Sequence, residues 1–350
     1  MNTEFKIILD KIEDVFKTFL SSSNKNWQDS SFGKIDSCIN ESHFSNLVDP
    51  CNHLISLGGK RWRPLFLVLV TKLVQESKNL PVDLSNALSL TPLVEFSHTA
   101  SLIHDDIEDG ADTRRGKPCS HITYGLDVSI NAASWLYFES AVSIQNLNVT
   151  DSQKCKLYEL FLRELRLLHL GQAMDIKWHR DSSLIPTHEE YIAMVRNKTG
   201  TLARLSCKIG SLCGGASSEE VENAGLIAQD IGVGFQIIDD VKNLTTGNPG
   251  KKRGDDVVEG KKSLPVLLHL KENPNDKEEL SKLFAIAKSE GIESSAVEKV
   301  ISLLTQSDSV QKAYEIGQKL VQQKSHELSV LFGKETETSV LIRDLFNSML

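Results

Sequence analysis

The chain has 350 residues, of which 40% are hydrophobic and 25% are charged, which is ordinary for a globular protein. Its formal net charge of -8 argues against a general nucleic-acid binder, because such proteins carry a basic face. Six cysteines without a CxxC pair fit neither a zinc site nor a disulfide framework. The longest aliphatic run near the N-terminus, 65–70, is far too short to cross a bilayer, and the first residues lack a signal-peptide core. We therefore expect a cytoplasmic protein without a transmembrane segment.

Most of the chain shows apolar residues at helical spacing, and few segments show the alternation of a strand. Residues 1–20 predict an amphipathic helix, and the polar residues 21–33 after it predict a mobile loop. The glycine pair at 58–59 ends the next helix, and Pro64 suits the first turn of the helix that follows.

A helix that begins at Thr91-Pro92 is predicted to run to about residue 109. Further helices are predicted over 128–146, 151–178, 188–213, 218–243, 263–271, 277–289, 294–304 and 307–330. The gap 245–254, rich in Gly, Pro and Lys, predicts a loop over a site. The sequence has no internal repeat and no long linker. The predicted fold class is therefore all-α, with one large helical domain over residues 46–350 and a helix-and-loop extension over residues 1–45.

The stretch DDIED at 105–109 concentrates four acids in five residues, which repel one another. Arg114 and Arg115 follow it closely, and a second acidic pair at 239–240 is followed by its own basic cluster at 251–253. Adjacent arginines could relieve part of the repulsion. A better explanation is that the carboxylates bind metal ions and the arginines bind a multiply charged anion. An acidic cluster followed by a basic cluster occurs twice in the chain, and this pattern predicts a metal–diphosphate site.

On a helix, Asp105 and Asp109 share a face, with β-carbons about 5–6 Å apart. That spacing suits one or two Mg²⁺ ions whose other ligands are water and phosphate oxygens. Asp106 points roughly 100° away and is expected to orient the site or pair with an arginine. An isolated cluster of this kind is equally consistent with a solvated helix end. The segment lacks the alternating ligands of an EF-hand, and 254–261 has the wrong spacing for a nucleotide phosphate loop.

Five segments together resemble the trans-isoprenyl diphosphate (polyprenyl) synthase family, in the family's order and spacing. They are GGKRWRP (58–64), HTASLIHDDIEDGADTRRGKP (98–118), GQAMD (171–175), NKTG (197–200) and FQIIDD (235–240). The resemblance implies an all-α isoprenoid synthase fold whose central cavity holds two acid motifs on facing helix ends, usually in a homodimer. It also implies a prenyltransferase that joins isopentenyl diphosphate to an allylic diphosphate by Mg²⁺-dependent head-to-tail (1'-4) condensation. Asn243 replaces the last aspartate of the second motif, as in some geranylgeranyl diphosphate synthases.

The family's functional positions map onto this chain residue by residue. The metal ligands of three Mg²⁺ ions map to Asp105, Asp109 and Asp239, supported by Asp106, Asp175 and Asp240. The positions that hold isopentenyl diphosphate map to Lys60, Arg63, His98 and Arg115. Those that grip the allylic diphosphate map to Arg114, Lys198 and Lys261, with Lys251 in the loop that closes over it. The predicted catalytic residues are Lys198 and the two groups whose oxygens face the developing cation, Thr199 and Gln236.

Product length depends on where the apolar tunnel below the acid motif ends. Ser101 lies one turn deeper than the motif on the same face, with Ala100 beside it, and both are small where short-chain members often place an aromatic floor. The predicted floor residues are Tyr137, Phe138 and His169, each of which is equally consistent with an ordinary core side chain. Together these residues favour a C20 product, geranylgeranyl diphosphate.

Four other functions remain open at this point. A farnesyl synthase or a longer-chain polyprenyl synthase shares the chemistry. A catalytically silent binding subunit is disfavoured by the intact acids and basic residues. A terpene cyclase would have no need for Lys60, Arg63 and Arg115.

Overall fold

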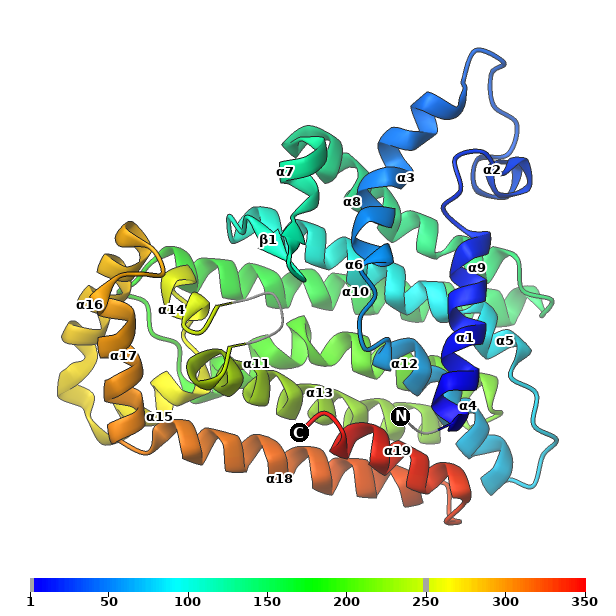
Figure 1. Ribbon diagram of the computed structural model, residues 1–350. Helices are drawn as coiled ribbons and strands as arrows, with labels where there is room; N and C mark the ends of the chain where they lie inside the picture. The colour runs from blue at the N-terminus through cyan, green and yellow to red at the C-terminus, as the bar shows by residue number, and fades with distance from the viewer. Residues whose placement is uncertain (1–2, 248–251) are drawn as a thin grey trace. The chain divides into compact units, whose positions relative to one another are not determined.

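The structure, a computed structural model, describes residues 3–247 and 252–350 (Figure 1). The described residues are helical almost throughout, so the all-α prediction is confirmed. Two short strands, β1 (Thr113–Arg114) and β2 (Lys117–Pro118), pair as an antiparallel hairpin. None of the helices in the described ranges is long and apolar enough to cross a membrane.

The chain divides into two compact units. Unit 1 comprises the residues up to Arg163, Leu205–Ala224 and Leu331–Ile342. Unit 2 comprises Glu164–Arg204, Gly225–Val330 and Arg343–Leu350. The described residues before 45 belong to unit 1 together with those that follow them, and the predicted boundary at 45/46 stays a prediction.

The helices wholly inside unit 1 are α1 (Thr3–Thr18), α2 (Lys25–Phe32), α3 (Glu41–Ser56), α4 (Trp62–Ser77), α5 (Ser85–Ser89), α6 (Thr91–Glu108), α7 (Ser120–Tyr124), α8 (Leu126–Ser140) and α9 (Val142–Gln145). Those wholly inside unit 2 are α11 (His188–Lys198), α14 (Asp255–Glu259), α15 (Leu264–Glu272), the 3-10 helix η1 (Pro274–Asp276), α16 (Lys277–Glu290), α17 (Ser295–Gln306) and α18 (Ser309–Val330). A unit boundary falls inside α10 (Asp151–Arg180), α12 (Gly200–Cys213), α13 (Ser218–Thr245) and α19 (Glu337–Asn347).

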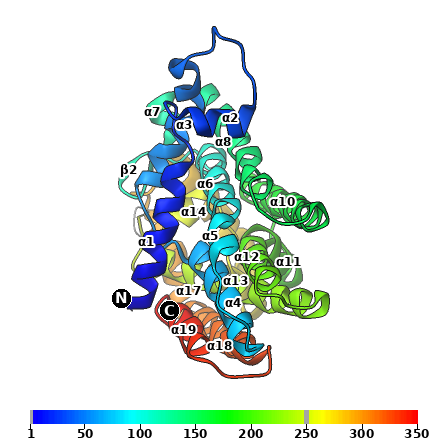
Figure 2. The same ribbon diagram turned by 90° about the vertical axis from the view of Figure 1, so that its right-hand side faces the viewer.

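The core of unit 1 is built around α4. Every residue of its aliphatic run 65–70 is at most 2% exposed, as expected for a helix that is apolar on all sides. Helices α3, α6 and α8 pack against one another, and α1 lies alongside α4, α5 and α6 (Figure 2). The apolar face of α1 is buried in these contacts through Phe5, Ile8, Ile12 and Phe16. This arrangement fixes the positions of α6 and of the loop before α4.

The core of unit 2 joins α11, α13 and α15 to α16, α17 and α18. Its buried side chains include Tyr191, Ile237, Leu280, Phe284 and Val300. Helices α16 and α17 lie side by side, and α15 packs against α18 (Figure 1). The unit thereby holds the C-terminal half of α13, which carries the second acidic pair.

Three local predictions are wrong. The predicted helix 128–146 is two helices, α8 and α9, with Ala141 between them. The polar segment 21–33 is not a loop, because Asn24 caps α2 and the ring of Trp27 is buried, with its Nε1 donating to Glu139 Oε1 at 2.8 Å. The predicted helix 188–213 is two helices, with Thr199 between them. The polar composition of 21–33 gives no sign that Trp27 is buried. The uninterrupted helical spacing of 188–213 gives no sign of the break at Thr199.

Candidate active site

The first acid motif lies at the C-terminal end of α6. The backbone N–H of Asp109 donates to Asp105 O at 2.8 Å, so the two residues are one helical turn apart as predicted. Asp106 is only 2% exposed and faces the interior of unit 1. Acids at the C-terminal, negative end of a helix dipole are unfavourable unless cations compensate them. The acids at this helix end therefore need nearby cations, and a metal ion as one of them stays a prediction.

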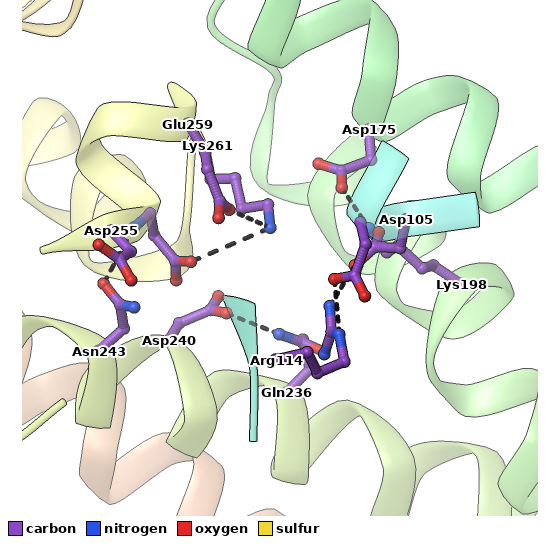
Figure 3. Close-up of polar contacts among 12 residues, drawn as sticks. Asp105, Arg114, Asp175, Lys198, Gln236, Asp240, Asn243, Asp255, Glu259 and Lys261 are labelled. Atoms are coloured by element: carbon purple, nitrogen blue, oxygen red, sulfur yellow. Dashed lines mark hydrogen bonds and ion pairs between the residues drawn. The ribbon is translucent and has the colours of Figure 1, made fainter. Parts of the chain in front are cut away.

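Arg114 supplies part of that compensation from the β1–β2 hairpin. Its Nε donates to Asp106 Oδ1 at 2.6 Å and its Nη2 donates to Asp105 Oδ2 at 3.4 Å (Figure 3). Burial lowers the pKa of Arg114, but Asp106 and Asp105 outweigh it and raise the pKa overall. The predicted pairing of Asp106 with an arginine is confirmed.

Arg115 points to a different place because it occupies the hairpin turn. Arg115 (φ 53°) and Gly116 (φ 74°) are both left-handed, as in the two-residue turn that suits strand twist. The Arg115 guanidinium donates to the carbonyl of Gly58 and to that of Leu54, the latter at 3.4 Å. A Cβ on Gly59 would lie 3.0 Å from Arg115 Nη2. Gly59 also has a φ of 144°, which residues with a side chain rarely adopt, so the loop between α3 and α4 needs glycine at this position.

Arg63 and His98 complete a basic group beside that loop. Arg63 Nη1 lies 3.2 Å from His98 Nε2, and the Arg63 guanidinium lies over the Trp62 ring at 4.5 Å. Because arginine only donates, His98 Nε2 must accept and the imidazole is neutral. Burial, followed by the charges of Arg63 and Arg115, lowers the pKa of His98 well below 6.5. Lys60 is exposed in the same loop, so the four predicted isopentenyl diphosphate positions gather within unit 1.

In unit 2, a chain of hydrogen bonds links the NKTG and FQIIDD motifs. Thr199 Oγ1 donates to Gln236 Oε1 at 2.7 Å, and Gln236 Nε2 donates to Asp240 Oδ1 at 2.8 Å. The other Asp240 oxygen, Oδ2, accepts from the Tyr191 hydroxyl at 2.8 Å. Burial and the nearby Asp256 carboxylate raise the pKa of Asp240.

These bonds separate the roles of the two neighbouring aspartates. Asp240 is held inside unit 2 by Tyr191 and Gln236, whereas Asp239 is exposed. The ligand role of Asp239 and the supporting role of Asp240 stay predictions. Sequence analysis missed Tyr191. Its only sequence signal is a hydroxyl on the apolar face of a helix two turns before Lys198.

Lys198 forms an ion pair with Asp175, the last residue of the GQAMD motif. The Lys198 Nζ lies 2.6 Å from Asp175 Oδ2, and both side chains are largely buried (Figure 3). The pair forms because α10 and α11 approach closely at Gly171, where a Cβ would collide with the backbone nitrogen of Lys198. Asp175 thus contacts a predicted diphosphate-binding lysine directly. Its predicted place near the metal stays a prediction.

Asn243 ties the end of α13 to the start of α14. It is fully buried, its Oδ1 accepts from the Asp256 backbone N–H at 3.2 Å, and its carbonyl accepts from the Gly254 N–H at 2.9 Å. In this role Asn243 caps a helix. Lys261, just beyond α14, lies 2.5 Å from Glu259 Oε2 and 4.0 Å from Asp256 Oδ1. Lys251, a predicted diphosphate contact, lies outside the described residues.

The predicted tunnel residues fall into two groups. Ala100 is fully buried, and the Ser101 hydroxyl donates to His98 O at 2.8 Å. Tyr137 is buried and stacks on His104 of α6, with ring centroids 5.8 Å apart and planes at 9°. These positions fit a tunnel wall next to α6.

Phe138 and His169 do not fit the predicted floor within one chain. Phe138 is 75% exposed on α8, and His169 is also exposed. The buried face of α8 includes Ala133, Leu136, Tyr137 and Ser140, and Phe138 lies outside it. The prediction for these two side chains is corrected accordingly.

The acidic side chains of each unit are of a kind that fits magnesium. Asp105 and Asp109 in unit 1, and Asp239 in unit 2, carry hard carboxylate oxygens, which Mg²⁺ prefers while it keeps water and phosphate oxygens as other ligands. Within residues 3–247 and 252–350, no group of three or more His, Cys, Asp or Glu side chains is already gathered as a metal site. The number of ions stays a prediction.

Comparisons with known proteins agree with the motifs. The family model described as polyprenyl synthetase matches residues 45–304. A geranylgeranyl pyrophosphate synthase of Gibberella zeae is 37% identical over 227 residues, covering 64% of this chain but only 57% of that relative's length. One from Aspergillus flavus is 36% identical over 258 residues, covering 72% of this chain and 70% of the relative. The solved geranylgeranyl pyrophosphate synthetase of Pyrococcus horikoshii aligns with a TM-score of 0.78 at 26% identity, covering 99% of this chain and 98% of that one.

Proposed function

The chain belongs to the polyprenyl synthetase family, as the motifs predicted, and from this membership we propose that it is a Mg²⁺-dependent prenyltransferase. The proposed reaction joins isopentenyl diphosphate to an allylic diphosphate by 1'-4 condensation and gives geranylgeranyl diphosphate. The observation that carries the proposal is the basic group of Arg63, Arg115 and neutral His98 in the same unit as the acid motif of α6. A terpene cyclase has no use for this second anion site.

In the proposal, Lys60, Arg63 and Arg115 bind the diphosphate of isopentenyl diphosphate. Guanidinium groups form bidentate hydrogen bonds with phosphate oxygens, which explains arginines at two of the three positions. His98 orients Arg63 through the 3.2 Å contact and, being neutral, adds no repulsion to the group.

Asp105, Asp109 and Asp239 are proposed to hold Mg²⁺, while Arg114, Lys198 and Lys261 contact the allylic diphosphate. When bound, Mg²⁺ would neutralise the negative charge that develops on the departing diphosphate. The ion pair with Asp175 fixes Lys198 Nζ before substrate arrives, so little reorganisation is needed when charge develops.

Thr199 and Gln236 are proposed to stabilise the allylic cation with their side-chain oxygens. In support, the bonds from Thr199 to Gln236 and from Gln236 to Asp240 fix both side chains. The double bond of isopentenyl diphosphate attacks the allylic carbon, and the proton lost afterwards passes to the departing diphosphate. An apolar cavity keeps water from trapping the cation.

A C20 product is proposed from the small residues Ala100 and Ser101 below the acid motif, with Tyr137 as the remaining floor candidate. The two fungal relatives named above carry the name geranylgeranyl pyrophosphate synthase, which agrees with this length. A farnesyl or longer-chain polyprenyl product is the alternative.

A cytoplasmic homodimer is the proposed form of the enzyme. Five large hydrophobic side chains are exposed along α7 and α8, namely Ile122, Tyr124, Leu126, Ile130 and Phe138. A stripe of this kind is typical of a surface that another chain covers. Sedimentation equilibrium of wild type and Phe138→Glu tests the dimer, which the variant should weaken. A monomeric wild type would contradict it.

The reaction is tested by incubating the purified protein with Mg²⁺, labelled isopentenyl diphosphate and each allylic diphosphate in turn. Chain length of the dephosphorylated products is then measured. The proposal expects a predominant C20 alcohol. A main product of C15, or one longer than C20, would select the alternative. A cyclic hydrocarbon or no product would contradict the function.

A further inference from the structure

Arg61 has an unusual backbone conformation at the centre of the loop that carries Lys60 and Arg63. Its φ of 45° and ψ of 28° are left-handed, a region that residues other than glycine rarely adopt. Such a conformation persists only when the surroundings fix it. Arg61 is also just 6% exposed, so its charge is held inside unit 1.

Three elements of unit 1 fix the Arg61 guanidinium. Its Nη1 donates to Glu95 Oε1 of α6 at 2.6 Å, and its Nη2 donates to the Ile55 carbonyl of α3 at 2.6 Å. Its Nε donates to Glu13 Oε1 of α1 at 2.8 Å. The guanidinium also lies 5.7 Å from the Phe16 ring of α1. Two of these four contacts come from the N-terminal helix.

The contacts determine where the neighbouring side chains point. With the Arg61 side chain held in the interior, Lys60 on one side is exposed and Arg63 on the other reaches His98. Arg61 also lies close to another cation, since its charge is among those that lower the pKa of Arg115. The carboxylates of Glu95 and Glu13 offset this crowding of like charge and leave Arg63 able to take a phosphate.

We propose that Arg61 and Glu13 are positioning residues for isopentenyl diphosphate, through which helix α1 holds the loop 58–63 in its substrate-binding conformation. The inference rests on the proposed function for the identity of the substrate. It gives the N-terminal helix a role in one of the two substrate sites. Neither residue contacts the reacting atoms.

The test compares Glu13→Gln with Asp14→Asn, its neighbour on α1. Asp14 is a matched control because its exposed carboxylate pairs with Lys17 on the same helix at 2.8 Å. In Glu13→Gln, the KM for isopentenyl diphosphate should rise about 3- to 10-fold, the range expected for one charged hydrogen bond to a half-exposed partner. The KM for the allylic diphosphate and the kcat should stay near wild type. Asp14→Asn should change none of the three.

A second readout does not depend on turnover. Hydrogen–deuterium exchange of the backbone amides in 58–63 should be faster in Glu13→Gln than in wild type or Asp14→Asn. If Glu13→Gln does not fold, Glu13→Asp replaces it, because the shorter acid keeps the charge but moves it away from Arg61. Unchanged exchange in the loop, or an equal rise in KM for both substrates, would overturn the inference. If wild type forms no prenyl product, the proposed function fails, and the exchange result still decides whether α1 holds the loop.

Discussion

The Tyr191 hydroxyl donates a 2.8 Å hydrogen bond to Asp240 Oδ2, and both residues are buried in unit 2. Gln236 donates to the other oxygen of the same carboxylate and accepts a hydrogen bond from Thr199. By fixing Asp240, Tyr191 therefore also fixes Gln236. A residue that no motif singles out therefore supports two predicted catalytic side chains. Its contribution to stability and to turnover can be separated.

Tyr191→Phe removes one hydrogen bond to a buried carboxylate and leaves the ring in place. The free energy of unfolding should fall by about 1–3 kcal/mol, the cost of leaving a buried polar group without one partner. The kcat should fall as well, while the KM for isopentenyl diphosphate is unchanged. Urea unfolding and steady-state kinetics provide both numbers. Tyr158→Phe is the control, because Tyr158 is a half-buried residue of α10 outside the predicted site. Wild-type stability in Tyr191→Phe would show that the bond contributes nothing.

His98 predicts a dependence of stability on pH. Its folded-state pKa lies well below the ordinary 6.5, first because it is buried and then because of the charges of Arg63, Arg115, Arg114 and Arg61. As the pH falls below 6.5, the unfolded chain binds a proton that the folded chain does not, so stability is lost on acidification. The loss from this group is at most about 1.4 kcal/mol per pH unit.

His98→Gln keeps a hydrogen-bond acceptor at this position but does not titrate. The unfolding free energies of wild type and this variant are measured in urea from pH 7.5 to 5. As the pH falls, wild type should lose more stability than the variant. Parallel curves would rule out His98 as the source of the acid sensitivity.

Asn243 gives a prediction about charge at the second acidic motif. Replacing it by aspartate keeps the acceptor for the Asp256 N–H but adds a buried carboxylate near Asp240 and Asp256. Burial and these neighbours should raise the pKa of the new acid, so the variant should lose about 1–3 kcal/mol at pH 8. It should recover toward pH 5 as the new acid takes up a proton. Equal stability of Asn243→Asp and wild type at pH 8 would contradict the predicted cost of a buried carboxylate at this position.

The small side chains of Ser101 and Ala100 are proposed to determine the product length. Ser101→Phe should shorten the main product by at least one C5 unit, because the new ring would block the tunnel one turn below Asp105. Ala100→Phe should also shorten it, but at a cost in stability of about 1–3 kcal/mol, since overpacking a fully buried site forces strain. Product analysis of both variants, with thermal unfolding of each, tests the tunnel. An unchanged C20 product in both variants would contradict the proposed tunnel.

Most of the helices and the local grouping of site residues could be predicted from the sequence, because they depend on short-range patterns. The one-turn spacing of Asp105 and Asp109 is a property of any helix. The divergence of Arg114 and Arg115 is different, since it requires the hairpin turn that Arg115 and Gly116 form.

The contacts that could not be predicted join residues far apart in the chain. Arg61 meets acids 48 and 34 residues away, at Glu13 and Glu95. Asp240 meets Tyr191 at a separation of 49 residues. No local spacing distinguishes these acids and this tyrosine from solvated ones. Helix packing alone brings the groups together, and a single sequence carries no direct record of it.

The role of the first acid motif is tested most directly by the turnover of Asp105→Ala beside that of Glu108→Ala. Both changes remove one carboxylate from the same stretch of α6, but only Asp105 is proposed to bind Mg²⁺. Steady-state condensation with saturating Mg²⁺ and both diphosphates should show a loss of at least about 10²-fold for Asp105→Ala, the order expected for removing one electrostatic stabiliser. Glu108→Ala should stay near wild type. Near-normal turnover in Asp105→Ala would contradict the assignment of this motif as the metal and diphosphate site.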